Sequence, residues 1–439
     1  MKIKIVLLFA VMLTTMLLSG CAGISEGVTR ALLADDGSGE ADSENKLICS
    51  IKGPSFKGIE THMKTKKPVG QNSHRIIKVL MVHGIGDHLP GYSTRLSNHL
   101  IHSLGLDKTE ETVKVVEIRD PRYYDEKIGH LTIARYFNEL TDRELLFYEL
   151  TWSDITKEEK KAIAYDVSGE FAFQRANINQ VMKGFLNEHI ADPMIYLGNS
   201  REKILRSVLQ GSCWMTHHGW TDVADYQEGN CVASRKSHAY QQNEDYIFVT
   251  HSLGSRIVID ALTRALEMTQ QTEERKGSLS PEEKYEALLF DRMKEKEFEV
   301  FMLANQLPLL QLGRAKPIVY GKIDQYCQKG GAHYDDRFFE KLSVIAFSDP
   351  NDLLSYSLPP NFRNEYMDSR LCPDITNVVL NVANVVPIFT LGEVANPLDA
   401  HANYDNDDRV IGLITNGLGT NGIDPEVSEN CTWLQTVDR

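Results

Sequence analysis

Residues 246–254 of this 439-residue chain read YIFVTHSLG, and they say most about how it folds. The apolar run, rich in β-branched and aromatic residues, predicts a buried strand, and the following THSLG segment predicts a sharp turn into a helix. Such a turn would lift the Ser252 side chain out of the sheet. Ser252 is therefore a candidate nucleophile, although a serine at this place could also be an ordinary helix N-cap.

A second strand-and-loop pattern lies upstream. Residues 76–82, IIKVLMV, predict a buried strand that runs directly into HGIG at 83–86. The loop resembles the His-Gly oxyanion loop of the α/β-hydrolase superfamily. In that family one oxyanion N–H comes from this loop and the other from the residue after the nucleophile. The resemblance implies Ile85 and Leu253 as the two donors.

Two downstream segments supply a possible acid and base. The apolar run 342–347, LSVIAF, is followed by SDPNDLL at 348–354, where the family keeps its triad carboxylate. DAHANY at 399–404, followed by an amphipathic stretch over 408–416, resembles the family's histidine loop before the last helix. The order serine, aspartate, histidine is typical of α/β-hydrolases. The resemblance therefore implies His401 as the general base.

Two aspartates compete for the acid position. The segment 352–360 resembles a pattern of lipid hydrolases related to phosphatidic-acid-preferring phospholipase A1, in which an aspartate precedes a short apolar-Tyr-Leu-Pro stretch. This favours Asp352, with Asp349 forming a turn before Pro350. Thr250 departs from the family, because most members carry glycine two residues before the nucleophile. A β-branched residue fits there only if the turn opens slightly.

The N-terminus has the features of an export signal. A basic start and a fourteen-residue apolar core predict a signal peptide over 1–20. LSGC at 18–21 resembles the lipobox of bacterial lipoproteins, which implies lipidation of Cys21; an ordinary cleavage site is the alternative. The polar segment 21–45 is expected to be a flexible tether, and 46–439 the globular domain. The predicted location is the cell envelope, lipid-anchored at the outer membrane or the periplasmic face.

Composition narrows the class of partner. The formal net charge of −14, with no basic stripe, makes nucleic acid an unexpected partner. Six cysteines remain besides Cys21, which allows up to three disulfides, and the Cys213–Cys231 pair is the most local candidate. Reduced core cysteines are the alternative. No metal-ligand spacing appears, the DNDD segment at 405–408 fails the EF-hand pattern, and no cofactor is expected.

Alternating strand-like and helix-like segments predict an α/β-hydrolase fold, a mostly parallel sheet with helices on both faces. Strands are expected near 76–82, 113–119, 145–151, 246–250, 298–304, 342–347 and 378–386. A helix is expected from Ser252 to about Met268. Residues of about 155–240 exceed what a minimal hydrolase needs and predict a mainly helical cap, and 270–296 predicts a polar insertion.

These features predict a serine hydrolase that cleaves carboxylic esters, plausibly lipids, through Ser252, Asp352 and His401. Thioesterase and acyltransferase activities use the same machinery, so the substrate stays open. Two other classes also stay open. One is a non-catalytic envelope protein that uses the scaffold for binding, and the other is a structural lipoprotein in which Ser252 only begins a helix.

Overall fold

The computed structural model describes residues 48–65, 75–167, 176, 179, 183–184, 186–233, 236–275, 291–388, 392–419 and 422–435. The expected signal peptide, Cys21 and the tether lie outside these residues, as does most of the expected polar insertion 270–296.

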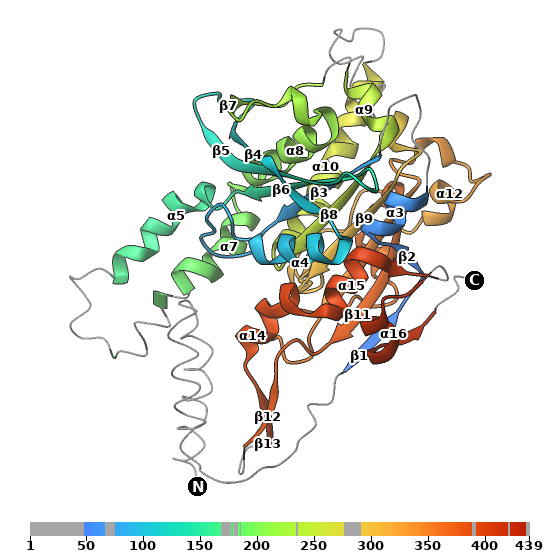
Figure 1. Cartoon of the computed structure of the whole chain (residues 1–439). Helices are drawn as coiled ribbons and strands as arrows, with labels where there is room; N and C mark the ends of the chain where they lie inside the picture. The colour runs from blue at the N-terminus through green and yellow to red at the C-terminus, as the bar shows by residue number, and fades with distance from the viewer. Residues whose placement is uncertain are drawn as a thin grey trace.

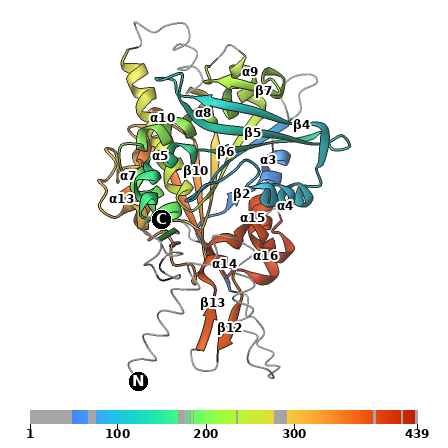
Figure 2. The same ribbon diagram turned by 90° about the vertical axis from the view of Figure 1, so that its left-hand side faces the viewer.

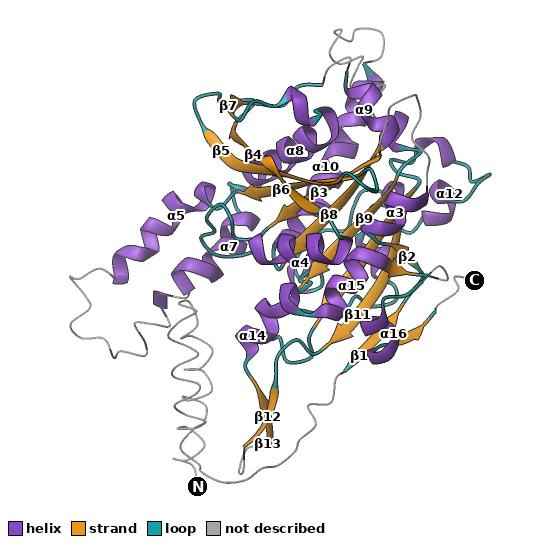
Figure 3. Ribbon diagram, viewed as in Figure 1, coloured by secondary structure: helices purple, strands orange, loops and turns teal. Residues whose placement is uncertain are grey.

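The described residues contain an eleven-stranded sheet in the order β15-β1-β11-β10-β9-β8-β3-β6-β5-β4-β7 (Figure 3). Its strands are β1 Cys49–Lys52, β3 Arg75–Val82, β4 Asp107–Arg119, β5 Lys127–Asn138, β6 Arg143–Thr151, β7 Tyr226–Gly229, β8 Glu244–His251, β9 Glu297–Leu303, β10 Lys341–Ser348, β11 Pro373–Leu380 and β15 Thr432–Leu434. The six strands from β6 to β11 in this order pair in parallel, and antiparallel β5 and β1 flank them. The expected mostly parallel central sheet is confirmed.

Helices cover both faces of the sheet (Figure 1). The α8 (Arg201–His217) and α10 (Gly254–Glu274) helices share one hydrophobic core with the sheet, and α3 (Ile59–Thr65), α4 (Thr94–Leu104) and α15 (Asp408–Asn416) share the other. Alternation along β3 feeds both cores, because Val79 and Met81 lie in one and Leu80 and Val82 in the other. A buried sheet of this kind needs apolar side chains on both faces.

One buried charge interrupts this apolar pattern. Lys78 of β3 is completely buried and pairs with Glu244 of β8, with 2.7 Å between Nζ and Oε2. Its ammonium also donates to the carbonyls of Met215 and His218, at the end of α8. Burial lowers the pKa of Lys78, and it raises the pKa of Glu244. This pair ties two central strands to a helix of the covering layer.

The expected strand over 378–386 was wrong in its bounds. The ladder ends at Leu380, and residues 385–388 form β12 (Val385–Ile388), which pairs with β13 (Gly392–Ala395) in a hairpin that projects from the body (Figure 2). The break has a physical cause. The N–H groups of Val382 and Ala383 donate to the Asp349 carboxylate in place of a neighbouring strand. The sequence analysis also missed β5, whose apolar residues alternate with arginine, histidine and threonine.

The region expected to be a helical cap separates into two parts. The α8 helix packs on the sheet and on α10, and β7 extends the sheet beside β4, so both belong to the main layers. In contrast, α5 (Asp154–Ala164), the π-helix η3 (Leu186–Ile190) and α7 (Ala191–Leu197) lie beside the loop that follows β3. Together, α5, η3 and α7 are called the helical insertion below.

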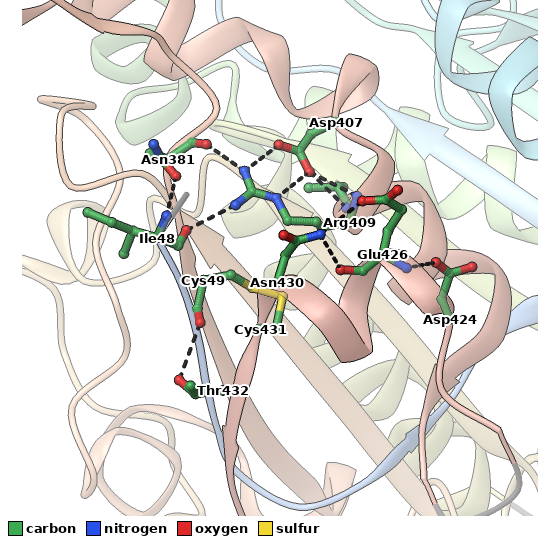
Figure 4. The surroundings of a disulfide bond; sticks show 11 residues. Ile48, Cys49, Asn381, Asp407, Arg409, Asp424, Glu426, Asn430, Cys431 and Thr432 are labelled. Carbon is green, nitrogen blue, oxygen red and sulfur yellow. Dashed lines mark hydrogen bonds and ion pairs between the residues drawn. A yellow bond between two sulfur atoms is a disulfide. The ribbon is translucent and has the colours of Figure 1, made fainter. Parts of the chain in front are cut away.

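Three disulfides pair the six described cysteines. The predicted Cys213–Cys231 bond is confirmed, and Cys327–Cys372 and Cys49–Cys431 are the other two. The last joins β1 to the residue before β15 (Figure 4). Beside it, Arg409 donates to the backbone carbonyls of Ile48 and Asn381. The two ends of the described chain are thus held at one edge of the sheet.

Candidate active site

The candidate site lies where the connections of the sheet change direction. From β3 the chain passes to β4, β5 and β6 on one side, then returns to β8 on the other side of β3 and continues outward through β9 and β10. Loops leaving the carboxyl ends of β3 and β8 therefore diverge, and such a switch point leaves a crevice for a ligand. The HGIG loop follows β3, and Ser252 follows β8.

Ser252 occupies the turn between β8 and α10 in a left-handed conformation, with φ of 56°. A non-glycine residue with positive φ costs free energy and is common at functional sites. The turn is held by the N–H of Ser252, which donates to the Leu303 carbonyl at 2.9 Å. The β8 strand continues through Thr250 up to the turn. The Thr250 hydroxyl donates to the Phe301 carbonyl of β9 at 3.4 Å.

Two glycines let the HGIG loop and the serine turn approach each other. A Cβ on Gly84 would lie 2.5 Å from the Ser252 Cβ, and one on Gly254 would lie 2.4 Å from the Val82 carbonyl. Neither position tolerates a side chain. The close approach brings the backbone of Gly84, the residue before Ile85, next to Ser252. Among the described residues, the N–H groups of Ile85 and Leu253 have no hydrogen-bond partner.

His83 anchors the start of the loop. Its Nδ1 donates to the Gly84 carbonyl at 2.9 Å, and its Nε2 accepts the N–H of Trp152 at 3.1 Å. The imidazole also stacks on the Trp152 indole, with ring centroids 4.7 Å apart. Burial lowers the pKa of His83 well below its ordinary value, so the ring is neutral and can make both contacts. His83 thus shapes the loop.

The structure brings His401 and Asp352 together. His401 lies in the short helix α14 (Pro397–Ala402), and its Nδ1 is 2.9 Å from Oδ2 of Asp352 in the loop after β10. Burial alone would raise the pKa of Asp352. The hydrogen bond and charge of His401, with the N–H of Leu354, outweigh that effect and lower it. An ionised Asp352 would hold His401 with Nε2 free to accept a proton.

Asp349 has a different set of partners. Oδ1 accepts the backbone and side-chain amides of Asn351, and Oδ2 accepts the N–H groups of Val382 and Ala383. Its own N–H donates to the buried Tyr404 hydroxyl at 2.7 Å. The carboxylate is fully used in shaping the chain, so the contacts favour Asp352 over Asp349 as the acid.

His251 connects the serine turn to His401. Its Nε2 donates to the His401 carbonyl at 2.8 Å, and the two rings meet edge to face with centroids 5.0 Å apart. Burial, with the charge of His401, lowers the pKa of His251 to about 3. His251 therefore stays neutral and keeps its Nε2–H for this contact. The contact places the base beside the residue that precedes Ser252.

Ser252 Oγ and His401 Nε2 are both buried, and neither has a hydrogen-bond partner among the described residues. The structure thus shows no hydrogen bond between these two atoms. Buried polar atoms without partners cost free energy and are rare. Other described residues, among them Ser207 and His218, also have such atoms, so these two matter because the His251–His401 contact brings their segments together.

Comparison with protein-family models, with curated proteins and with solved structures gives no match. Across the described ranges, no three His, Cys, Asp or Glu side chains are grouped so as to hold a metal ion. In the same residues no helix is both long and apolar enough to span a bilayer.

Proposed function

We propose that the protein is a serine hydrolase of the α/β-hydrolase type that cleaves carboxylic esters. Ser252 would attack the carbonyl carbon, His401 would take the hydroxyl proton, and Asp352 would stabilise the imidazolium. The N–H groups of Ile85 and Leu253 would bind the oxyanion. Water would then release the acyl group from Ser252 by the reverse proton transfers.

The observation that carries this proposal is the convergence of three separate segments at one switch point. The strained Ser252 turn, the His401–Asp352 pair and the glycine loop after β3 meet there. A helix N-cap would need none of these neighbours, and a binding scaffold would not need an aspartate–histidine pair beside the serine turn.

A fluorophosphonate probe tests the proposal, because it reacts covalently with an activated serine. The wild-type protein should be labelled and should hydrolyse short nitrophenyl esters, whereas Ser252→Ala should do neither. Ser255 is a nearby serine that should not be labelled, because its hydroxyl donates a hydrogen bond to the Ser252 carbonyl at 2.7 Å. Labelling that persists in Ser252→Ala, or moves to Ser255, would contradict the proposal.

The expected lipid anchor at Cys21 suggests a substrate class and a location for this activity. If Cys21 carries a lipid anchor at the cell envelope, the enzyme meets membrane acyl esters at high local concentration. We therefore propose that the enzyme hydrolyses lipid esters and that it acts from the outer membrane or the periplasmic face. Longer acyl chains should then raise kcat/KM, since each buried methylene can add about 0.8 kcal/mol. A chain-length series on soluble esters measures this, and a flat series would favour small esters.

A further inference from the structure

The helical insertion contacts the loop after β3 through Asp192 and Lys160. Asp192 of α7 is completely buried, and its Oδ2 accepts the N–H of Gly86 at 2.7 Å. Its Oδ1 lies 2.8 Å from Nζ of Lys160 on α5. A buried carboxylate is tolerated when a counter-charge and hydrogen bonds accompany it. Asp192 has both, in Lys160 and in the Gly86 N–H.

Lys160 holds the surrounding elements as well as Asp192. Besides this ion pair, its ammonium contacts Asp87 at 2.9 Å and the Glu188 carbonyl at 2.8 Å. It thereby links α5, the π-helix before α7 and the loop that contains Gly86. The lysine is itself buried, so its contacts are screened little by water.

Two consecutive peptide units of the loop are fixed by side chains. In the first unit, the Gly84 carbonyl accepts from His83, and the N–H belongs to Ile85. In the second unit, the Ile85 carbonyl accepts from Nε2 of His88 at 3.0 Å, and the Gly86 N–H goes to Asp192. The Ile85 N–H has no partner in the described part of the chain. The Gly84 carbonyl, the Ile85 carbonyl and the Gly86 N–H are all hydrogen-bonded to side chains. These three contacts fix the direction of the Ile85 N–H.

Gly86 makes the loop and the insertion interlock. Its φ is 100°, and a Cβ there would lie 2.6 Å from Nδ1 of His189, which precedes α7. The loop can take this conformation only with glycine, and the insertion packs directly on it. A change in the position of α7 would therefore move the loop.

We propose that Asp192 is a positioning residue that aims the oxyanion N–H of Ile85, so that the helical insertion completes the catalytic site. This inference rests on the proposed hydrolase function. Asp192 does not touch the substrate. Losing it would release the Gly86 N–H and leave the 85–86 peptide held only by His88. Ile85 could then shift, and its N–H would move away from the place where the oxyanion forms. A displacement of about 1 Å is enough to cost roughly 10²-fold in rate.

Asp192→Ala and Asp192→Asn test the inference. For a nitrophenyl butyrate, Asp192→Ala should lower kcat by about 10²-fold with KM changed less than about threefold, because the contact matters in the transition state. Affinity for a trifluoromethyl ketone of the same acyl group, which mimics the oxyanion, should fall by a similar factor. Asp192→Asn keeps an acceptor oxygen for the Gly86 N–H, so its kcat and its affinity for the ketone should each fall by only about tenfold. Glu158→Gln on α5, whose side chain is 79% exposed, is the matched control and should behave as wild type.

The outcomes separate this inference from the proposed function. A folded Asp192→Ala protein with wild-type kcat and ketone affinity overturns the inference while Ser252-dependent hydrolysis by the wild type still stands. A loss seen only in KM overturns it too, since it would indicate a substrate contact. If Asp192→Ala does not fold, Asp192→Asn decides by the same two measurements. A wild-type protein without Ser252-dependent activity overturns both.

Discussion

At the scale of single residues, the contacts of two neighbouring aspartates agree with the preference for Asp352 over Asp349 that the pattern at 352–360 suggests. Asp349 and Asp352 follow the same strand, and either could be an acid in a strand-to-loop pattern. The choice depends on which carboxylate meets a histidine 49 residues further on. Sequence patterns did point to Ser252 and His401, because a strand-turn-helix and a histidine before an amphipathic helix are local features.

Asp192 shows the limit of such reasoning. Its role depends on a contact with Gly86, 106 residues away, and nothing in its own neighbourhood indicates that contact. The HGIG loop was visible from the sequence, but the side chains that hold its peptide units were not. Only the packing of the insertion on the loop brings them together.

The two aspartates can be compared directly by mutation. Asp352→Asn should lower kcat by up to about 10⁴-fold with little loss of stability, because His401 would lose the partner that fixes its tautomer. Asp349→Asn should keep most of its activity per folded molecule but unfold at a lower temperature, since an amide has one acceptor oxygen for four donors. Ester hydrolysis and thermal unfolding of both variants measure this. An inactive yet stable Asp349→Asn protein would reverse the assignment.

At the scale of elements, the central strands and the outer strand β4 were predictable, whereas β5 and the strands β1, β7 and β15 were not. Continuous apolar runs mark β3, β8, β9 and β10, which are buried on both faces. The β5 strand carries arginine, histidine and threonine among its apolar residues, and the end of β11 depends on Asp349. The burial of Lys78 was not predictable from its own strand, because the partner that makes it possible, Glu244, belongs to another strand.

Removing one partner of the Lys78–Glu244 pair should destabilise the sheet. Glu244→Gln leaves the buried ammonium without its counter-charge, which typically costs about 3–5 kcal/mol. The expected result is a lower free energy of unfolding in urea. Glu228→Gln is a suitable control, because Glu228 pairs with Arg119 on the surface. Equal stability of Glu244→Gln and wild type would mean that the pair contributes nothing net.

The α8 helix should make stability depend on pH. Burial lowers the pKa of His217 to about 4, against an unfolded value near 6.5. Between these values the unfolded chain binds a proton that the folded chain does not, so stability falls as pH falls from about 6.5 to 4. This histidine should account for up to roughly 3 kcal/mol of the loss. Urea titrations at pH 7 and pH 4 measure how much the free energy of unfolding falls between the two values. The fall should be smaller for His217→Asn than for wild type, and an equal fall would count against His217 as the cause.

At the scale of the whole molecule, two hydrophobic cores lie on opposite faces of one sheet, and the candidate site lies between them at the carboxyl ends of the strands. The alternation of segments in the sequence was enough to predict these layers. It was not enough to divide residues 155–240 correctly, because α8 packs on the sheet whereas α7 packs on α5, η3 and α8, and the sequence of neither helix shows which partner it meets.

The Cys49–Cys431 bond turns the described part of the chain into a closed ring. A protease that cuts one exposed loop anywhere between these cysteines opens the ring but releases no fragment. A singly nicked protein should run as one species on a denaturing gel without reductant and as two after thiol treatment. In Cys49→Ala/Cys431→Ala, the same nick should give two species on both gels unless another disulfide spans the cut. A protein of this design stays one molecule after a single cut in its backbone.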